Sequence, residues 1–431
     1  MALRARPGHR YPAQVAGTLA LCFAFELADI NSFAYVAPAV HHSLHLGLRA
    51  ISVVTAAGFL GMFAGATAGG RVAERLGRRR ALRGSVLWFS ICSLATAGAF
   101  DTTSLLAARF LTGCGLGSMT VVAITYLTEL VPADRRGRTQ AATLGAGLLG
   151  IPAMAFFARA VIDLGPQGWR LVFVFGGLGL VPLVLTRRLP ESPAWLLAQG
   201  REAEAASIAA AIERRAGSPL ATTTPARVPV RELFHGRFAR PTALLAIVWV
   251  LLTISYYGFA SFAPTLLHEH GFTLTRSVGY TALTTLGAVP GALLAWPVAD
   301  RFGLRGPVAV FSLLFAGAGV AYGLTFAPAA VVVFGFLVAA LNQTLVALLY
   351  SHTPRLFPAP IRATATGLCY GAGRLANALG PLLVGQIYLT LGYTPVFVFV
   401  GACGAVIALA VLVLAPRNRA ATGAVTRPSP R

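Results

Sequence analysis

The chain has 431 residues, of which 56% are hydrophobic and only 11% are charged. Because about one-quarter of an ordinary soluble domain is charged, this composition argues against a soluble enzyme, a disordered chain and a disulfide scaffold. The formal net charge is +21, and all 35 basic residues are Arg. An odd number of cysteines, scattered through apolar stretches, predicts buried thiols rather than a disulfide or metal framework. They are Cys22, Cys92, Cys114, Cys369 and Cys403.

Apolar blocks of membrane-spanning length follow one another along the sequence. A bilayer core about 30 Å thick needs roughly 20 apolar residues in a helix. The first block is too long, and too polar at its centre, for a cleavable signal peptide. We therefore predict an all-α membrane protein with twelve transmembrane helices. They lie at 14–40, 50–70, 82–100, 103–127, 139–162, 169–186, 242–267, 277–298, 307–327, 329–351, 363–390 and 394–415.

One long polar segment divides these helices six and six. It predicts four parts: an N-terminal six-helix bundle at 1–186, a central cytoplasmic loop at 187–240, a C-terminal six-helix bundle at 241–415 and a cytoplasmic tail at 416–431. The central loop has the composition of one or two short surface helices, followed by a looser Thr/Pro stretch at 217–229.

The placement of Arg predicts the orientation. If the N-terminus is cytoplasmic, 29 Arg lie on the cytoplasmic side, four lie outside and two lie within helices. The positive-inside rule then places both termini in the cytoplasm of a multi-pass protein of the cell (inner) membrane. The charge of +21 is thus explained by topology beside the lipid bilayer, and no nucleic acid partner is expected.

Similar residues recur in the two halves, and matching residues are always separated by the same number of positions in the sequence. We call this separation the repeat offset. Four places share it: Ala37-Pro38 with Ala263-Pro264, Glu74-Arg75 and Gly77 with Asp300-Arg301 and Gly303, Leu130, Pro132 and Arg136 with Leu356, Pro358 and Arg362, and Gly145-Ala146-Gly147 with Gly371-Ala372-Gly373. Six predicted helices separate each residue from its counterpart in the other half. Because this number is even, both halves keep the same orientation, as in parallel-repeat carriers that bind substrate between the halves.

The segment from Gly70 to Arg79 matches a loop signature, G-x-x-x-D-R-x-G-R-R, with Glu74 in place of Asp. On the strength of this motif and the repeats, the chain resembles the major facilitator superfamily, and the resemblance extends over nearly its full length. The resemblance implies that the acid and Arg groups bridge helix ends in one conformation and release in another. The gating candidates are Gly70, Glu74, Arg75, Gly77 and Arg78, with Asp300, Arg301 and Gly303 in the second copy.

Further motifs narrow the resemblance to one part of the family. Arg109-Phe110-Leu111-Thr112-Gly113, the run 188–196 with its Pro-Glu-Ser-Pro, and the run 353–374 look like the aromatic-acid:proton and metabolite:proton symporter branches. Sugar porters share the Pro-Glu-Ser-Pro run, but the residues at 255–257 are Ser-Tyr-Tyr and not their Gln pair. The antiporter signature in the fifth helix is broken at 145–152, which argues against drug efflux.

Four charged residues lie well inside the predicted helices, where each needs a partner or a cavity. Glu26 and Asp29 are three residues apart, hence on one helix face, and a carboxyl pair in a poorly solvated site suits proton coupling. This pair resembles the acid-x-x-Asp pair of aromatic-acid symporters. Arg109 is expected to pair with Asp29 or to hold an anionic substrate. Arg374 is expected to anchor a carboxylate or to serve as a structural partner.

Polar and aromatic residues at matching depth are candidates for the cavity wall, with interhelical hydrogen bonding as the alternative. They are Asn31, Phe33, Tyr35, Ser255, Tyr256, Tyr257, Asn342 and Gln343.

Other motifs are assigned to structure. The glycines at 113–117 follow no strand, so they predict tight helix packing and not a dinucleotide loop. The histidines at 41–45 and 268–270 are expected in solvated external loops, so we predict no metal site.

The sequence favours a proton-coupled symporter that imports a small organic acid or related metabolite. The alternatives are a drug or metabolite efflux antiporter, a sugar or polyol uptake carrier, and a receptor built on the carrier fold. We expect no enzymatic activity and no cofactor. The expected partners are a small-molecule substrate, a proton and the bilayer, with the chain working as a monomer.

Overall fold

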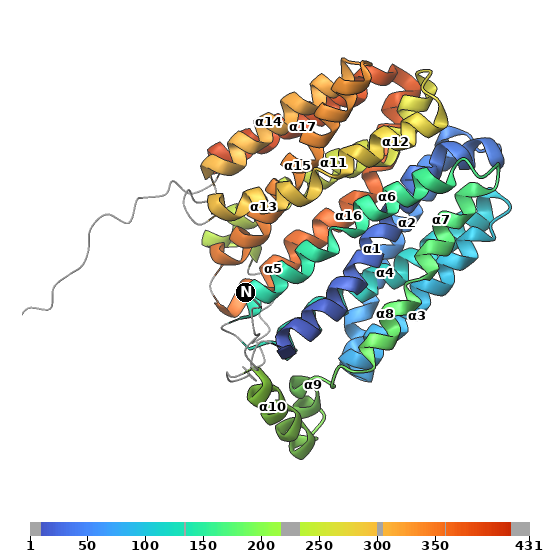
Figure 1. Cartoon of the computed structure of the whole chain (residues 1–431). Helices are drawn as coiled ribbons and strands as arrows, with labels where there is room; N and C mark the ends of the chain where they lie inside the picture. Colours follow the sequence, from blue (N-terminus) through green and yellow to red (C-terminus); the bar gives the residue numbers. More distant parts are fainter. Residues whose placement is uncertain (1–9, 133–134, 217–232, 300–304, 358, 415–431) are drawn as a thin grey trace, which may run out of the picture.

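The computed structural model describes residues 10–132, 135–216, 233–299, 305–357 and 359–414. Within these ranges the chain forms α-helices with short 3-10 turns, and it contains no strand. Figure 1 shows most of the helices side by side in one bundle. The predicted all-α class is therefore confirmed.

The helices before the central polar segment match the first predicted blocks. They are α1 (Arg10–Ser43), α2 (Leu48–Leu76), α3 (Arg78–Ala97), α4 (Thr102–Leu130), α5 (Arg136–Gly147), α6 (Gly150–Val161), α7 (Gly168–Gly177) and α8 (Leu180–Thr186). The central segment contains α9 (Pro193–Ala198) and α10 (Glu202–Ala216), as expected for short surface helices. The Thr/Pro stretch at 217–229 lies outside the described residues.

The remaining helices match the later blocks. They are α11 (Gly236–Glu269), α12 (Leu274–Thr285), α13 (Ala288–Ala299), α14 (Arg305–Gly323), α15 (Pro328–His352), the 3-10 helix η3 (Thr353–Leu356), α16 (Ala359–Leu391) and α17 (Tyr393–Leu414). Among the described residues, ten segments are long and apolar enough to cross a membrane. The blocks predicted at 82–100 and 363–390 are helical as well, but α3 and α16 carry charged and polar side chains and are not among the ten.

Proline divides three of the predicted membrane segments into two helices each. The breaks lie between α5 and α6, α7 and α8, and α12 and α13. In each case the break begins four residues before a proline, namely Pro152, Pro182 or Pro290. A proline has no N–H to donate to the carbonyl four residues earlier and its ring clashes there, so the helix is interrupted at that turn.

Glycines allow close contact between α2 and α4. A Cβ on Gly65 would lie 1.9 Å from the Cys114 carbonyl oxygen, and one on Gly117 would lie 2.0 Å from the Met62 carbonyl oxygen. The glycines at 113–117 therefore serve helix packing, as predicted. The first contact recurs at the repeat offset, where a Cβ on Gly291 would lie 2.0 Å from the Ala340 carbonyl oxygen.

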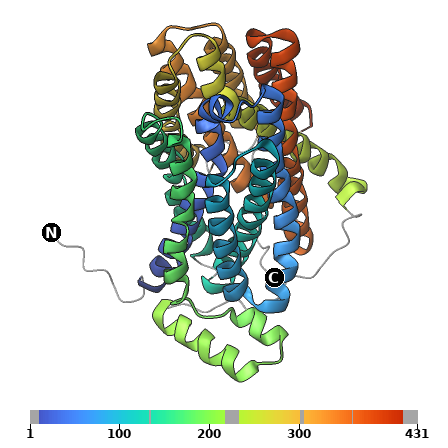
Figure 2. The ribbon, with the colours of Figure 1, turned by 90° about the vertical axis from the view of Figure 1, so that its right-hand side faces the viewer.

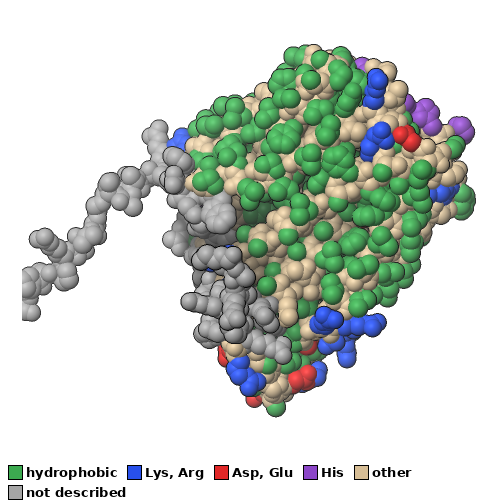
Figure 3. All heavy atoms as spheres, viewed as in Figure 1, with side chains coloured by type: hydrophobic (Ala, Val, Ile, Leu, Met, Phe, Trp, Pro, Cys, Tyr) green, Lys and Arg blue, Asp and Glu red, His purple; other side chains and the backbone are tan. Residues whose placement is uncertain are grey.

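The two ends of the bundle differ from its apolar sides and from each other. Figure 2 shows α9 and α10 beyond one end, where the Trp195 indole N–H donates to the Glu74 carbonyl oxygen at 2.7 Å. Figure 3 shows a mainly hydrophobic face with Arg gathered near that end and His at the opposite end. This distribution suits a molecule whose sides contact lipid.

The histidine prediction is wrong in part. His41 and His42 lie in the last turns of α1, and His268 lies in the last turns of α11, rather than in loops. The Nε2 atoms of His42 and His268 are 3.0 Å apart. These two residues are themselves related by the repeat offset. No group of three or more potential metal ligands occurs among the described residues.

The glycine contact between α2 and α4 gives a stability test. Gly65→Ala should lower stability by on the order of 1–3 kcal/mol, because the added Cβ forces the helices apart. A Cβ on Gly70 meets nothing within 4 Å, so Gly70→Ala should leave stability unchanged or raise it. Thermal unfolding of the purified variants in detergent measures both. Equal melting temperatures for the two variants would contradict the close contact.

Candidate functional site

Asp29 on α1 is held by a buried ion pair. Arg109 Nη1 on α4 donates to Asp29 Oδ1 at 2.9 Å, and both side chains are almost completely buried. Ser93 Oγ on α3 donates to Asp29 Oδ2 at 2.5 Å, and the Arg109 guanidinium also lies over the Phe173 ring. Asp29 therefore joins three helices, and of the two roles expected for Arg109 the structure shows the pairing with Asp29.

Glu26 lies on the same face of α1 but has different partners. Its Oε1 accepts a hydrogen bond from Thr120 on α4, and the side chain is buried. The charge of Arg374, far away in the sequence on α16, also acts on Glu26. The two carboxylates share a helix face, as predicted, but they do not share one binding partner.

Arg374 has an incompletely satisfied guanidinium. Its Nη1 is buried and has no hydrogen-bond partner among the residues that the structure describes. Its charge reaches Glu26, Tyr257 on α11 and Tyr350 on α15. A buried charged donor left without an acceptor costs several kcal/mol. Arg374 thus stands at a place where an anion would be stabilised.

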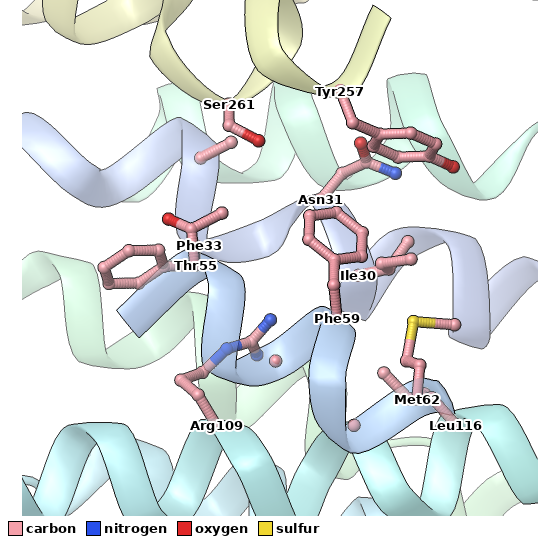
Figure 4. A pocket seen from close by; sticks show the side chains of 13 residues that line it. Ile30, Asn31, Phe33, Thr55, Phe59, Met62, Arg109, Leu116, Tyr257 and Ser261 are labelled. Carbon is pink, nitrogen blue, oxygen red and sulfur yellow. The ribbon is translucent and has the colours of Figure 1, made fainter. Parts of the chain in front are cut away.

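A narrow cavity lies beside these charges, between α1, α2, α4 and α11 (Figure 4). Its volume is about 20 Å³, which is enough for roughly one water molecule. A metabolite would need the surrounding helices to separate. Its wall includes four of the predicted residues and others that were not predicted. They are Ile30, Asn31, Phe33, Ala34, Thr55, Gly58, Phe59, Met62, Arg109, Gly113, Leu116, Tyr257 and Ser261.

The predicted tyrosines lie next to this cavity. The Tyr257 ring contacts Phe59 and Tyr256, with centroids 5.0 Å and 5.4 Å apart. Tyr35 is buried on α1, which packs against α11. These aromatic side chains bring α1, α2 and α11 together.

The other polar candidates are placed differently. Asn31 Nδ2 donates to the Leu27 carbonyl oxygen of its own helix at 2.7 Å. Ser255 likewise donates to the Leu252 carbonyl oxygen at 3.1 Å. Asn342 Nδ2 lies 3.4 Å from Gln343 Oε1, whereas Asn342 Oδ1 is buried with no hydrogen-bond partner in the described chain. Asn342 therefore keeps a free acceptor, whereas the hydrogen bonds of Asn31 and Ser255 stay within their own helices.

The loop between α2 and α3 forms an ion pair and a hydrogen bond that the sequence did not reveal. Arg78 binds Glu129 at the end of α4 through two nitrogens, at 3.0 Å and 3.1 Å. Glu191 accepts a hydrogen bond from the backbone N–H of Arg79 at 3.0 Å. Glu129 directly precedes the repeated residues Leu130 and Pro132 but was not singled out, while Glu191 belongs to the Pro-Glu-Ser-Pro run and was identifiable from it.

The predicted glycines of this loop have unequal roles. Gly77 has a φ of 94°, and a Cβ there would lie 2.6 Å from Glu191 Oε2, so both its conformation and its surroundings require glycine. Gly70, in contrast, faces open space, since a Cβ there would meet nothing within 4 Å, so no close helix contact requires it. Glu74 and Arg75 are exposed at the end of α2. Asp300, Arg301 and Gly303 lie outside the described residues.

Comparisons with known proteins agree on one family. The family model described as Major Facilitator Superfamily matches residues 19–295 and 278–429. YyaJ of Bacillus subtilis (strain 168), named as a putative metabolite transport protein, is 38% identical and covers 96% of this chain and 94% of its own. The gallate transporter of Pseudomonas putida is 30% identical and covers 95% of this chain and 94% of its own.

A solved structure supports the fold. The xylose transporter XylE from E. coli, in a partially occluded inward open conformation, has a TM-score of 0.75 at 18% identity. The match covers 96% of this chain and 100% of that chain. With the ten apolar segments, these relatives identify a multi-pass membrane protein.

The Asp29–Arg109 pair gives a second prediction. Arg109→Met should destabilise the fold by about 3–5 kcal/mol, because Asp29 is left charged and buried. The double variant Asp29→Asn, Arg109→Met should recover most of that loss. The control is Arg159→Met, which breaks a half-exposed pair with Asp163 and should cost less than about 1 kcal/mol. Thermal unfolding measures all of these proteins, and additive losses in the double variant would contradict the pairing.

Proposed function

Because the chain belongs to the major facilitator superfamily, we propose that it imports a small organic acid together with a proton. It is a membrane carrier and not an enzyme, and its substrate is a small molecule. Gallate, which one relative is named for, is an aromatic carboxylate. This relative supports an organic acid over a sugar or polyol.

The unpaired guanidinium nitrogen of Arg374 carries the proposal. Arg374 Nη1 is buried without an acceptor in the described chain, and the planar fork of Arg binds carboxylates through two hydrogen bonds. The counterpart of Arg374 at the repeat offset is Leu148, so the repeated fold does not require a charge there. A substrate carboxylate would supply the missing acceptor.

Glu26 supplies the coupling in this proposal. When Glu26 is ionised, its charge attracts Arg374 and competes with a substrate carboxylate. When Glu26 takes up a proton from outside, Arg374 becomes available to the substrate anion. After the helices rearrange, the proton and the anion leave to the inside, and Glu26 and Arg374 attract each other again. Asp29 remains paired with Arg109 throughout and holds α1, α3 and α4 in register.

We propose that twelve transmembrane helices form two six-helix halves, at 1–186 and 241–415. Three observations support this: two contacts in the first half recur between the corresponding residues of the second half, and one contact joins a residue to its own counterpart. The Gly65–Cys114 contact recurs as Gly291–Ala340, and the Gly147–Phe23 contact recurs as Gly373–Trp249. His42 touches its own repeat counterpart, His268. Two equivalent residues touch only near an axis that relates the two halves.

The remaining features follow from this arrangement. The Arg distribution supports a cell-membrane protein with both termini in the cytoplasm, and we propose that the chain works as a monomer. The cytoplasmic gate would involve Arg78 with Glu129, and Glu191 with the turn at Gly77. Glu74, Arg75, Asp300, Arg301 and Gly303 stay candidates for that gate.

The proposal is tested in proteoliposomes with an imposed pH gradient, inside alkaline. The parent chain should give carrier-dependent accumulation of benzoate, an aromatic carboxylate, measured as the uptake beyond that of protein-free liposomes, because neutral benzoic acid crosses the bilayer unaided. Glu26→Gln should lose accumulation but retain benzoate exchange, because a permanently neutral side chain cannot release a proton. Arg374→Gln should lose both, and Arg374→Lys should retain weak exchange. Accumulation by a folded Glu26→Gln variant would overturn the role of Glu26.

The direction of transport is read from the same vesicles. Extrusion of benzoate against the gradient would instead indicate an exporter. Binding without any flux would indicate a receptor. The control variant Arg159→Met, whose ion pair is half-exposed, should transport like the parent.

A further inference from the structure

A cluster of three aromatic rings lies one helical turn from Arg374. Trp249 on α11, Tyr350 on α15 and Tyr370 on α16 contact one another, with ring centroids 5.1 Å, 4.8 Å and 4.6 Å apart. Arg374 follows Tyr370 by one helical turn, and its charge acts on Tyr350. Trp249 is buried, whereas both tyrosines are partly exposed. The tyrosine side of the cluster is therefore not fully covered by the protein.

The indole N–H of Trp249 is a second unsatisfied donor. Trp249 Nε1 is buried and has no hydrogen-bond partner among the described residues, as is the case for Arg374 Nη1. Trp249 contacts both tyrosines, and Arg374 acts on Tyr350 and lies one helical turn after Tyr370. Buried polar groups are normally hydrogen-bonded, so two orphaned donors beside one cluster point to an acceptor that arrives with a ligand.

The repeat shows that packing does not require these polar groups. The counterparts in the first half, at the repeat offset, are all apolar: Phe23 for Trp249, Ile124 for Tyr350, Leu144 for Tyr370 and Leu148 for Arg374. Phe23, Ile124 and Leu144 belong to one hydrophobic cluster. Phe23 packs on Gly147 as Trp249 packs on Gly373. The same backbone arrangement is thus stable with hydrocarbon alone, and the later copy carries an indole N–H, two hydroxyls and a guanidinium instead.

We propose that Trp249 is a substrate-binding residue. Its indole N–H and the Arg374 guanidinium together hold the substrate carboxylate, while Tyr350 and Tyr370 contact the planar ring attached to it. Aromatic rings prefer edge-to-face or offset contacts with other rings, so the site favours a planar aromatic acid over a saturated one of equal size. This assignment rests on the proposed function, because it assumes that an organic anion is carried.

The test measures the dissociation constants of benzoate and cyclohexanecarboxylate for purified full-length protein in detergent, by calorimetry. Trp249→Phe keeps the ring, as at Phe23, but removes the N–H. It should weaken binding of both acids about tenfold, as expected for loss of a hydrogen bond to a charged group. Tyr370→Leu, which installs the residue found at 144, should reduce the preference for benzoate over cyclohexanecarboxylate at least severalfold.

Trp88→Phe is the matched control. Trp88 is half-exposed on α3, and its indole N–H donates to the Leu111 carbonyl oxygen, so binding should equal that of the parent. The proposal is overturned if folded Trp249→Phe binds both acids as the parent does while Arg374→Gln does not, and the proposed function then stands. If the parent binds neither acid, both proposals fail. If Trp249→Phe does not fold, Tyr370→Leu decides through the benzoate preference, and an unchanged preference overturns the site.

Discussion

A charge buried between apolar helices needs an opposite charge or a ligand, and this constraint shapes the interior of the protein. Asp29 and Arg109 satisfy each other at 2.9 Å within the helices near the N-terminus. Arg374 has one buried nitrogen unpaired among the described residues, and its charge acts on Glu26 and two tyrosines. The first pair stabilises a fixed arrangement, whereas Arg374 keeps a buried donor that no described residue satisfies.

The close glycine contacts allow such charges to be positioned. Because α2 and α4 touch backbone to backbone at Gly65 and Gly117, α4 can bring both Arg109 and Thr120 to the face of α1. The same contact near Gly291 brings α15 against α13. Against this common framework, the polar groups at Trp249 and Arg374 stand out, since Phe23 and Leu148 occupy the corresponding positions. The two copies share their packing and differ in chemistry.

At the loop between α2 and α3, an ion pair and a hydrogen bond connect the signature segment Gly70–Arg79 to the rest of the bundle. Arg78 and the backbone of Arg79 contact Glu129 and Glu191, which lie 51 and 112 residues away along the chain. These partly exposed contacts are weaker than the Asp29–Arg109 pair because water screens them. Contacts of this strength can break and form again as helix ends move.

The sequence by itself determined the helices, because hydropathy and proline act locally: the predicted blocks are helical, and three of them break four residues before a proline. Composition and spacing also placed Glu26 and Asp29 on one face and suggested Arg109 as a partner. Only the tertiary structure decided that Arg78 binds Glu129, that Gly70 faces open space, and that Arg374 acts on Glu26 while the Trp249 N–H has no partner among the described residues. Each of these depends on how side chains from distant helices meet. Neither the periodicity of the sequence nor the spacing of its motifs contains information on such contacts.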